Sequence, residues 1–271
     1  MSDTFDRLGY GTYKLENPAE CAAAVTHAID VGYRHIDTAQ GYDNEASVAD
    51  GIDRSGVDRD ELFVATKLST DNLAYDDVIE TAKESRKRLG VDSIDLLYVH
   101  WPIRTYDPAE TLPALDHLVE EGVIEHVGLS NFRPDQLEAA IDRLDSPVFA
   151  HQVECHPLLQ QRELRAVALE DDHWLVAYSP IARNRVADVD TLQEIADEYD
   201  ASPAQVSLAW LLSKETVAPI PKAASFDHIE DNWAARDLDL DDDALARIDE
   251  IEREERIVDF EEAPWNEAGN V

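Results

Sequence analysis

Eight short runs with the composition of β-strands alternate with helical segments along the whole of this 271-residue chain. Between the runs, apolar residues recur at helical spacing, as in Ala22, Val25 and Ile29. Strands that alternate with helices form βαβ units and a parallel sheet. Eight such units in about 250 residues predict a (β/α)8 barrel. The expected strands are 8–12, 33–37, 62–67, 94–99, 126–129, 149–154, 174–178 and 217–220.

Helix boundary signals support this division of the chain. Asn17-Pro18 and Ser202-Pro203 have the cap and proline that begin helices, whereas Gly32 and Gly90 follow helical patterns. No proline-rich or Ser/Gly-rich linker interrupts the chain, so we expect a single TIM-barrel domain over residues 1–271. The alternative is a doubly wound sheet with a second domain. It fits less well because Gly9-Tyr10-Gly11 lacks the third glycine of a dinucleotide-binding turn.

The charge of the chain restricts its partners. Asp and Glu total 59 against 23 Lys and Arg, giving a formal net charge of −36, and the carboxylates are spread along the whole sequence. Nucleic acids and anionic membranes attract basic patches, so neither is an expected partner. A carboxylate-rich solvent face suits a protein that works in concentrated salt, where ions screen self-repulsion. The composition therefore predicts an acidic surface and a salt-adapted, haloarchaeal-like source.

The sequence also gives expectations about compartment and metal. No apolar run approaches the roughly 18 residues of a membrane helix, and the N-terminal segment lacks the pattern of a secretory signal. Cys21 and Cys155 match no zinc-binding spacing and are too few for a disulfide scaffold. We expect a cytoplasmic protein without a metal, and we also expect a monomer.

In a barrel of this kind, chemistry is located at the C-terminal ends of the strands. Only six of the 23 basic residues are lysines, yet Lys67 and Lys222 both fall at expected strand ends. An unpaired ammonium is costly to bury, so a lysine ending a buried strand needs a partner. The other polar residues at these ends are Asp37, His100, Ser130, Asn131, Gln152, Glu154, Tyr178 and Ser179.

Several motifs at these strand ends resemble those of the aldo-keto reductase family. The stretch Tyr33-Arg-His-Ile-Asp-Thr-Ala-Gln-Gly-Tyr-Asp-Asn-Glu45 is similar to the family pattern G-x-R-x-x-D-T-A-x-x-Y-x-N-E. The resemblance covers essentially the whole chain. It continues in family order through Val64-Ala-Thr-Lys67, Leu96-Leu-Tyr-Val-His100-Trp-Pro, Gly128-Leu-Ser-Asn-Phe132, Gln152-Val-Glu-Cys-His-Pro157, Ala177-Tyr-Ser-Pro180 and Ile220-Pro-Lys222.

The resemblance implies an enzyme that transfers a hydride from NAD(P)H to aldehydes or ketones. Tyr42 would donate the proton, and Lys67 would lower its pKa by favouring the phenolate. Asp37 would pair with Lys67, and His100 would donate a hydrogen bond to the substrate oxygen. Four matching positions on three consecutive strands make this tetrad the expected catalytic group.

The resemblance also assigns contacts to the cofactor. Ser130, Asn131 and Gln152 match partners of the nicotinamide carboxamide, which offers one acceptor and two donors. Tyr178 matches the aromatic residue that stacks on the nicotinamide. The positions expected at the phosphates and the adenosine end are Ser179, Lys222 and Asn232.

One departure from the family pattern affects the choice of cofactor. His228 replaces an arginine, and Ala223 replaces a serine or threonine, beside the expected phosphate site. Histidine does not reproduce a bidentate guanidinium contact. Lys222 favours NADP, while NAD or dual use remains open.

The substrate is less well defined. Tyr13 and Trp101 match aromatic positions of the family's substrate pocket, and Trp265 lies in the tail that completes it. The family's N-terminal hairpin, which plugs the barrel, has little counterpart before Leu8. The alternative function is a nicotinamide-binding, redox-sensing or partner-binding subunit with little turnover. A barrel isomerase or metal hydrolase would need phosphate-loop or metal-ligand residues that the sequence does not offer.

Overall fold

The computed structural model describes residues 5–269, in which eight parallel strands form one sheet in chain order. The expected strands are all present with small changes in their ends, which confirms the single-domain (β/α)8 barrel and excludes the doubly wound alternative. The strands are β1 (Gly9–Gly11), β2 (His35–Asp37), β3 (Phe63–Leu68), β4 (Ile94–Val99), β5 (Ile124–Ser130), β6 (Val148–Glu154), β7 (Trp174–Tyr178) and β8 (Val217–Pro219).

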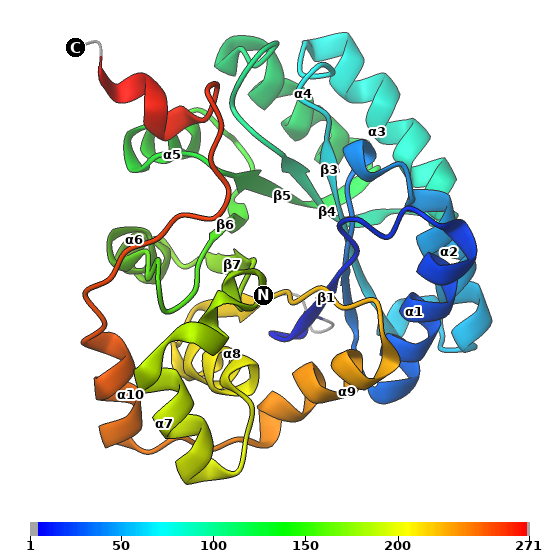
Figure 1. Cartoon of the computed structure of the whole chain (residues 1–271). Coiled ribbons are helices and arrows are strands. Elements are labelled where there is room, and N and C mark those ends of the chain that lie inside the picture. Colours follow the sequence, from blue (N-terminus) through cyan, green and yellow to red (C-terminus); the bar gives the residue numbers. More distant parts are fainter. Residues whose placement is uncertain (1–4, 270–271) are drawn as a thin grey trace.

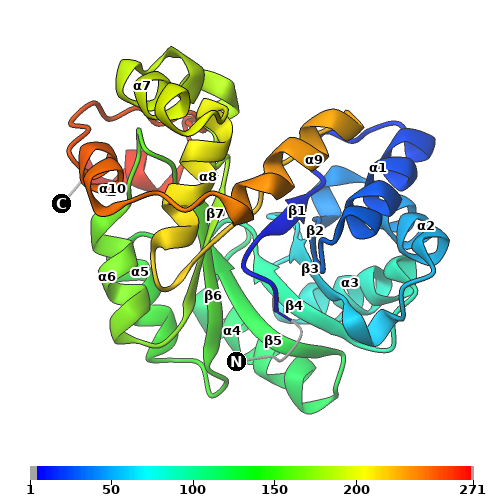
Figure 2. The ribbon, with the colours of Figure 1, turned by 90° about the horizontal axis from the view of Figure 1, so that it is seen from below.

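The helices surround the sheet, as Figures 1 and 2 show from two directions. Asn17 Oδ1 accepts hydrogen bonds from the amides of Ala19 and Glu20, and Gly32 ends the first helix at φ 133°. Within residues 5–269, no helix combines the length and apolar character needed to cross a bilayer. The helices are α1 (Pro18–Val31), α2 (Glu45–Ser55), α3 (Tyr75–Leu89), α4 (Pro108–Glu120), α5 (Pro134–Ile141), α6 (Arg162–Glu170), α7 (Asp190–Tyr199), α8 (Pro203–Ser213), α9 (Phe226–Ala234) and α10 (Asp242–Asp249).

The barrel closes where β1 meets the segment after β8. The Gly11 amide donates a hydrogen bond to the Pro221 carbonyl at 3.0 Å. A Cβ atom at Gly9 would lie 2.7 Å from Ile220 Cγ2, and one at Gly11 would lie 3.0 Å from the Ile220 carbonyl oxygen. Glycine is therefore favoured at this seam, because a Cβ atom would meet the His35 and Ile220 side chains at Gly9 and the Ile220 backbone at Gly11.

Alternation along the strands fills the barrel with side chains. The interior cluster consists of Phe63, Ala65, Leu96, Tyr98, Ala150, Val176, Ala218 and Ile220. A separate, larger core lies between the sheet and the helices. This division gives every strand two buried faces, which explains why the strand sequences read as nearly continuous apolar runs.

A single aromatic residue packs against the N-terminal ends of the strands. The Phe5 ring lies 5.0 Å from the rings of His35, Phe63 and Trp174, measured between centroids, and 5.3 Å from that of Phe149. The first strand in the described part of the chain begins only at Gly9. Phe5 therefore contributes to closing the barrel bottom where the resemblance led us to expect at most a shortened hairpin.

Candidate active site

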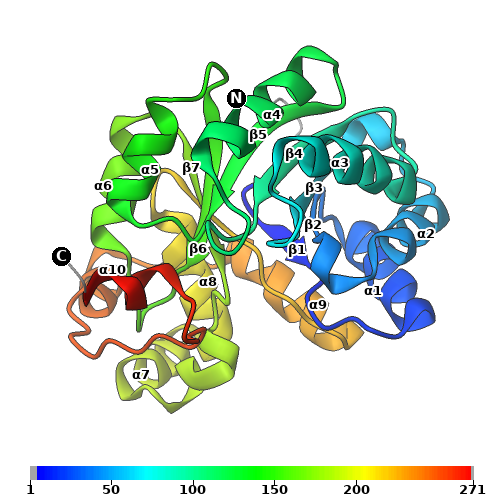
Figure 3. The same ribbon diagram turned by 90° about the horizontal axis from the view of Figure 1, so that it is seen from above.

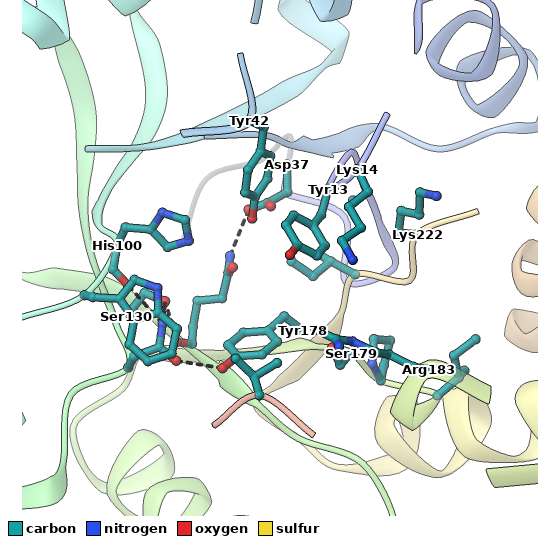
Figure 4. A pocket seen from close by; sticks show the side chains of 18 of the residues that line it. Tyr13, Lys14, Asp37, Tyr42, His100, Ser130, Tyr178, Ser179, Arg183 and Lys222 are labelled. Carbon is teal, nitrogen blue, oxygen red and sulfur yellow. Dashed lines mark hydrogen bonds between the residues drawn. The ribbon is translucent and has the colours of Figure 1, made fainter. Parts of the chain in front are cut away.

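A cavity of about 600 Å³ opens at the C-terminal ends of the strands (Figure 4). Strand ends and the loops that follow them supply nearly all of its wall, as expected for a barrel enzyme. Its lining residues are Gly11, Tyr13, Lys14, Asp37, Tyr42, His100, Trp101, Ser130, Asn131, Gln152, Tyr178, Ser179, Pro180, Ile181, Arg183, Asn184, Ile220, Lys222, Val258 and Phe260.

A buried ion pair forms the base of the cavity. The fully buried Lys67 Nζ donates to Asp37 Oδ1 at 2.5 Å and to the Thr38 carbonyl at 2.7 Å. Asp37 Oδ2 accepts from Gln152 Nε2 at 2.8 Å. Burial lowers the pKa of Lys67, and the charge of Asp37 opposes that effect. The carboxylate thus favours the ammonium form in a site that would otherwise favour the neutral amine.

Tyr42 lies above this pair, at the end of a short 3-10 turn (Gln40–Tyr42). The centroid of its ring is 5.1 Å from Lys67 Nζ and 5.8 Å from the His100 ring centroid. Burial raises the pKa of Tyr42 well above 10, and Asp37 raises it further. The free site therefore departs from the expected acidification by Lys67. Burial is the larger cause and the negative charge of Asp37 is the second, and both favour the neutral phenol of Tyr42.

The pKa of His100 is shifted down, whereas that of Tyr42 is shifted up. Burial, helped by the charge of Lys67, lowers its pKa to about 3. The imidazole is therefore neutral at physiological pH and has one N–H to donate. A neutral imidazole can polarise a carbonyl oxygen, but it is a far weaker acid than imidazolium. Of the two side chains, Tyr42 is the better proton donor.

Amide and hydroxyl groups form one wall of the cavity. Asn131 Nδ2 donates to the His100 carbonyl and to Ser130 Oγ, both at 2.9 Å, and Tyr178 Oη donates to Asn131 Oδ1 at 2.9 Å. Ser130 Oγ donates to the Gln152 carbonyl at 2.9 Å. Figure 4 shows Tyr178 beside this cluster, with its ring along the cavity. This wall offers donors, acceptors and a flat aromatic face, which fit a nicotinamide ring with its carboxamide.

Three cations lie along the remainder of the cavity. Lys14, Arg183 and Lys222 all line it, and within residues 5–269 none of the three makes an ion pair with a carboxylate. Burial and the neighbouring charge of Lys14 lower the pKa of Lys222. Three unpaired cations in a chain of net charge −36 form a binding surface for anions, and phosphate groups fit it.

Two of these cations were missed by the sequence reasoning. Lys14 carried a signal, since it is one of only six lysines and follows β1 closely. Arg183 belongs to no recognised motif. It follows Ala182 and precedes Asn184 in a loop where all three residues have φ between 48° and 72°. Nothing in local sequence predicts that this loop lines the cavity.

The remaining expected residues divide into two groups. Ser179, Tyr13 and Trp101 all line the cavity. Asn232 is buried on α9 and is not among the lining residues, so the structure does not bring it to this site, and its cofactor contact remains a prediction.

The C-terminal part of the chain adds residues that sequence reasoning did not name. Val258 and Phe260 line the cavity, and the Phe260 ring lies 4.9 Å from that of Trp101 between centroids. The Trp265 ring, expected near the pocket, lies 5.5 Å from the Trp101 ring between centroids, although Trp265 is not among the lining residues. Trp101 and Phe260 give the cavity aromatic surface next to His100.

Comparisons with known proteins agree with this geometry. The sequence profile described as "Aldo/keto reductase family" matches residues 7–253. The chain is 36% identical over 254 residues to a 9,11-endoperoxide prostaglandin H2 reductase of Trypanosoma cruzi, covering 93% of this chain and 89% of that protein. It is 36% identical over 250 residues to a glyoxal reductase of Bacillus subtilis, covering 92% and 90%.

One solved structure resembles this chain in both fold and sequence. The crystal structure of a Bombyx mori aldo-keto reductase in complex with NADP matches with a TM-score of 0.88 and 31% identity, covering 95% of this chain and 92% of that one. The relatives named here are bacterial, protozoan and insect proteins, and they give no support to a haloarchaeal source. The extent of these matches shows that the chain belongs to the aldo/keto reductase family.

Proposed function

We propose that this protein reduces aldehyde and ketone carbonyls with NADPH, with Tyr42 as the general acid. One observation carries the proposal: a neutral phenol, a neutral imidazole and the Lys67–Asp37 pair meet in a cavity that also presents three unpaired cations. The phenol, the imidazole and the ion pair suit proton donation to a carbonyl oxygen, and the three cations suit a phosphorylated cofactor.

The residues divide the chemistry between them. Bound NADPH supplies the hydride that adds to the carbonyl carbon. Tyr42 and His100 each donate a hydrogen bond to the carbonyl oxygen, which fixes its position and stabilises the negative charge that develops on it. Tyr42 then transfers its proton to that oxygen, completing the alcohol and leaving a phenolate.

The raised pKa of Tyr42 is compatible with this step. An alkoxide is a much stronger base than a phenolate, so proton transfer from the phenol remains favourable. Lys67 Nζ, 5.1 Å from the ring centroid, stabilises the phenolate as it forms. Asp37 keeps the lysine charged while the site is empty, so the cation is in place before the reaction begins.

The cation set supports NADP as the cofactor. Lys222, the residue expected at the phosphates, lines the cavity, and Lys14 and Arg183 add two positive charges along it. His228, the departure from the family pattern, is exposed on α9 and does not line the cavity. Titration of NADPH and NADH binding by fluorescence tests the preference. Tighter binding of NADPH supports the proposal, whereas equal affinities would favour the use of both cofactors.

The aromatic end of the cavity supports a class of substrates. Tyr13, Trp101 and Phe260 offer apolar surface beside His100, with few polar groups to select one compound. Relatives of this chain include proteins named glyoxal reductase and methylglyoxal reductase. We infer that small aldehydes and dicarbonyl compounds are reduced here.

The direct test is NADPH oxidation with simple aldehydes by the parent protein and by Tyr42→Phe. The variant loses the proton donor but keeps the ring, so turnover should fall by about 10²-fold or more while NADPH affinity is retained. Undiminished reduction by the variant would refute the role of Tyr42. Absence of turnover in the parent, despite NADPH binding, would instead favour a redox-sensing subunit.

We further infer adaptation to concentrated salt, a monomeric state and a cytoplasmic location. The charge of −36 supports the first, together with exposed carboxylates such as Asp239, Asp242 and Asp243. Self-repulsion is screened by salt, so the melting temperature and NADPH affinity should both rise from dilute buffer to molar salt. Equal values would remove the salt-adaptation proposal. Sedimentation across the same salt range tests the monomer.

A further inference from the structure

The segment between α10 and the C-terminal turn, residues 251–263, is here called the strap. In Figure 1 it runs from α10 past α6 and the end of β6 toward α5, drawn in orange-red to red, and Figure 3 shows the same segment from above. Val258 and Phe260 of the strap line the cavity, and the Phe260 ring packs edge-on against Trp101, the residue after His100. The strap thus provides part of the wall at the substrate end.

One buried carboxylate binds the strap backbone. Glu154 is the last residue of β6, and its side chain is fully buried. Its Oε1 accepts from the Ile257 amide at 2.6 Å, and its Oε2 accepts from the Val258 amide at 2.8 Å. His156 Nε2 lies 2.9 Å from Oε1 and completes the set. The proposed reaction uses neither Glu154 nor His156.

The energetics make this contact a strong determinant of the strap position. A buried carboxylate is costly unless hydrogen bonds satisfy it, and both oxygens of Glu154 obtain theirs from adjacent strap amides. If the strap moved away, Glu154 would lose two donors at once. The amide of Glu255, which donates to the Leu158 carbonyl at 2.7 Å, is a second attachment nearby. Val258, whose amide Glu154 binds, is itself the first strap residue that lines the cavity.

We propose that Glu154 is a positioning residue for substrate recognition, which fixes the strap so that Val258 and Phe260 form a rigid wall of the carbonyl pocket. The inference rests on the proposed reductase function. Loosening the wall should weaken binding of a carbonyl compound large enough to touch it. The proton donor, the Lys67–Asp37 pair and the unpaired cations lie outside the strap, so chemistry and NADPH binding should persist.

The first test is Glu154→Gln, which keeps the size of the side chain. An amide presents an NH₂ group in place of one oxygen, so one of the two strap amides must lose its acceptor. We expect KM for 4-nitrobenzaldehyde to rise roughly tenfold, as for loss of one charge-assisted hydrogen bond. KM for methylglyoxal, kcat for both substrates and the Kd of NADPH should stay within about twofold.

A matched pair of strap variants makes the test independent of the buried glutamate. Ile257→Pro removes the N–H that Glu154 Oε1 accepts, whereas Ile257→Ala shortens the half-buried side chain and keeps the N–H. The proline variant should reproduce the KM rise and the alanine variant should not. Glu255→Gln is the control for charge, because Glu255 pairs with Arg185 and Arg253 through its side chain on the same strap.

A structural readout separates this inference from the proposed function. The Val258 amide donates to the buried Glu154 Oε2, so it exchanges with deuterium only when the strap opens. Exchange of this amide should be about tenfold faster in Glu154→Gln and in Ile257→Pro than in the parent and in Ile257→Ala. This measurement needs no turnover, so it remains decisive even if no aldehyde proves to be a substrate.

Three outcomes would overturn the inference. Unchanged exchange of the Val258 amide in both Glu154→Gln and Ile257→Pro would show that Glu154 does not hold the strap. Equal KM increases for the small and the large aldehyde would show that the wall is not selective. If Glu154→Gln does not fold, identical behaviour of the proline and alanine variants would overturn it.

Discussion

Lys67 Nζ lies 2.5 Å from Asp37 Oδ1, and both side chains are almost completely shielded from solvent. The two residues come from neighbouring strands, β3 and β2, and the pair is reinforced by Gln152 from β6. A buried ion pair contributes little net stability, but removing one partner is strongly destabilising because the other charge remains buried. The pair is therefore a sensitive point of both the fold and the chemistry.

Asp37→Asn should impair the protein in two ways. It leaves an ammonium buried beside a neutral amide, which should cost about 3 kcal/mol of unfolding free energy. The pKa of Lys67 should fall further, so the alkaline limb of kcat/KM should move to lower pH. Urea unfolding and a pH–rate profile measure these effects. Asp71→Asn, which removes an exposed partner of Arg104, should change stability by less than about 1 kcal/mol.

The low pKa of His100 in the folded protein makes the free energy of unfolding depend on pH. Its pKa is about 3 when folded and about 6.5 when unfolded, so below pH 6.5 the unfolded state binds more protons. The free energy of unfolding should therefore fall as pH drops through this window. Between about pH 6.5 and pH 5, this residue contributes a loss of about 2 kcal/mol, from about 1.4 kcal/mol per pH unit. His100→Asn should show a correspondingly shallower decline in urea midpoint, and an unchanged slope would contradict the assignment.

The unpaired cations predict the response of cofactor binding to charge removal. Lys14→Gln and Arg183→Gln should each weaken NADPH binding by about tenfold, the effect of losing one charge-assisted contact. Lys87→Gln is the control, since Lys87 is an exposed lysine on the outer helix α3. Fluorescence titration at one fixed salt concentration gives the comparison. Losses within twofold of the control would show that the cations do not contact the cofactor.

The packing of Phe5 at the barrel bottom should contribute to the stability of the fold. Phe5→Ala removes the ring that contacts His35, Phe63, Phe149 and Trp174, so we expect a loss of about 3 kcal/mol in unfolding free energy. Phe226→Ala, at a half-exposed ring that stacks on His27, should cost less than about 1 kcal/mol. Urea unfolding of the two variants tests this, and equal costs would show that Phe5 does not close the barrel.

The sequence predicted the fold because each strand is buried on both faces and each helix has its own boundary residues. Those signals are local, so the positions of eight strands could be derived without a structure, whereas Tyr42 and the roles of the tetrad were assigned by the family resemblance. The barrel rule then placed Asp37, Lys67 and His100 at one edge of the sheet, since the C-terminal ends of parallel strands share that edge. The seam between β1 and residues 220–221, by contrast, depends on contacts more than 200 residues apart.

Electrostatics and long-range contacts required the tertiary structure. The sequence suggested that Lys67 lowers the pKa of Tyr42, but burial and the charge of Asp37 raise it. Desolvation depends on everything that surrounds a group in space, and it leaves no trace in neighbouring residues of the chain. Arg183, Val258 and Phe260 could not be predicted as lining residues either, because they reach the cavity only through the folding of distant segments. The residue types at the strand ends thus determined the kind of reaction that the site supports. The pKa values of these groups and the shape of the pocket depend on segments that meet only in the folded chain.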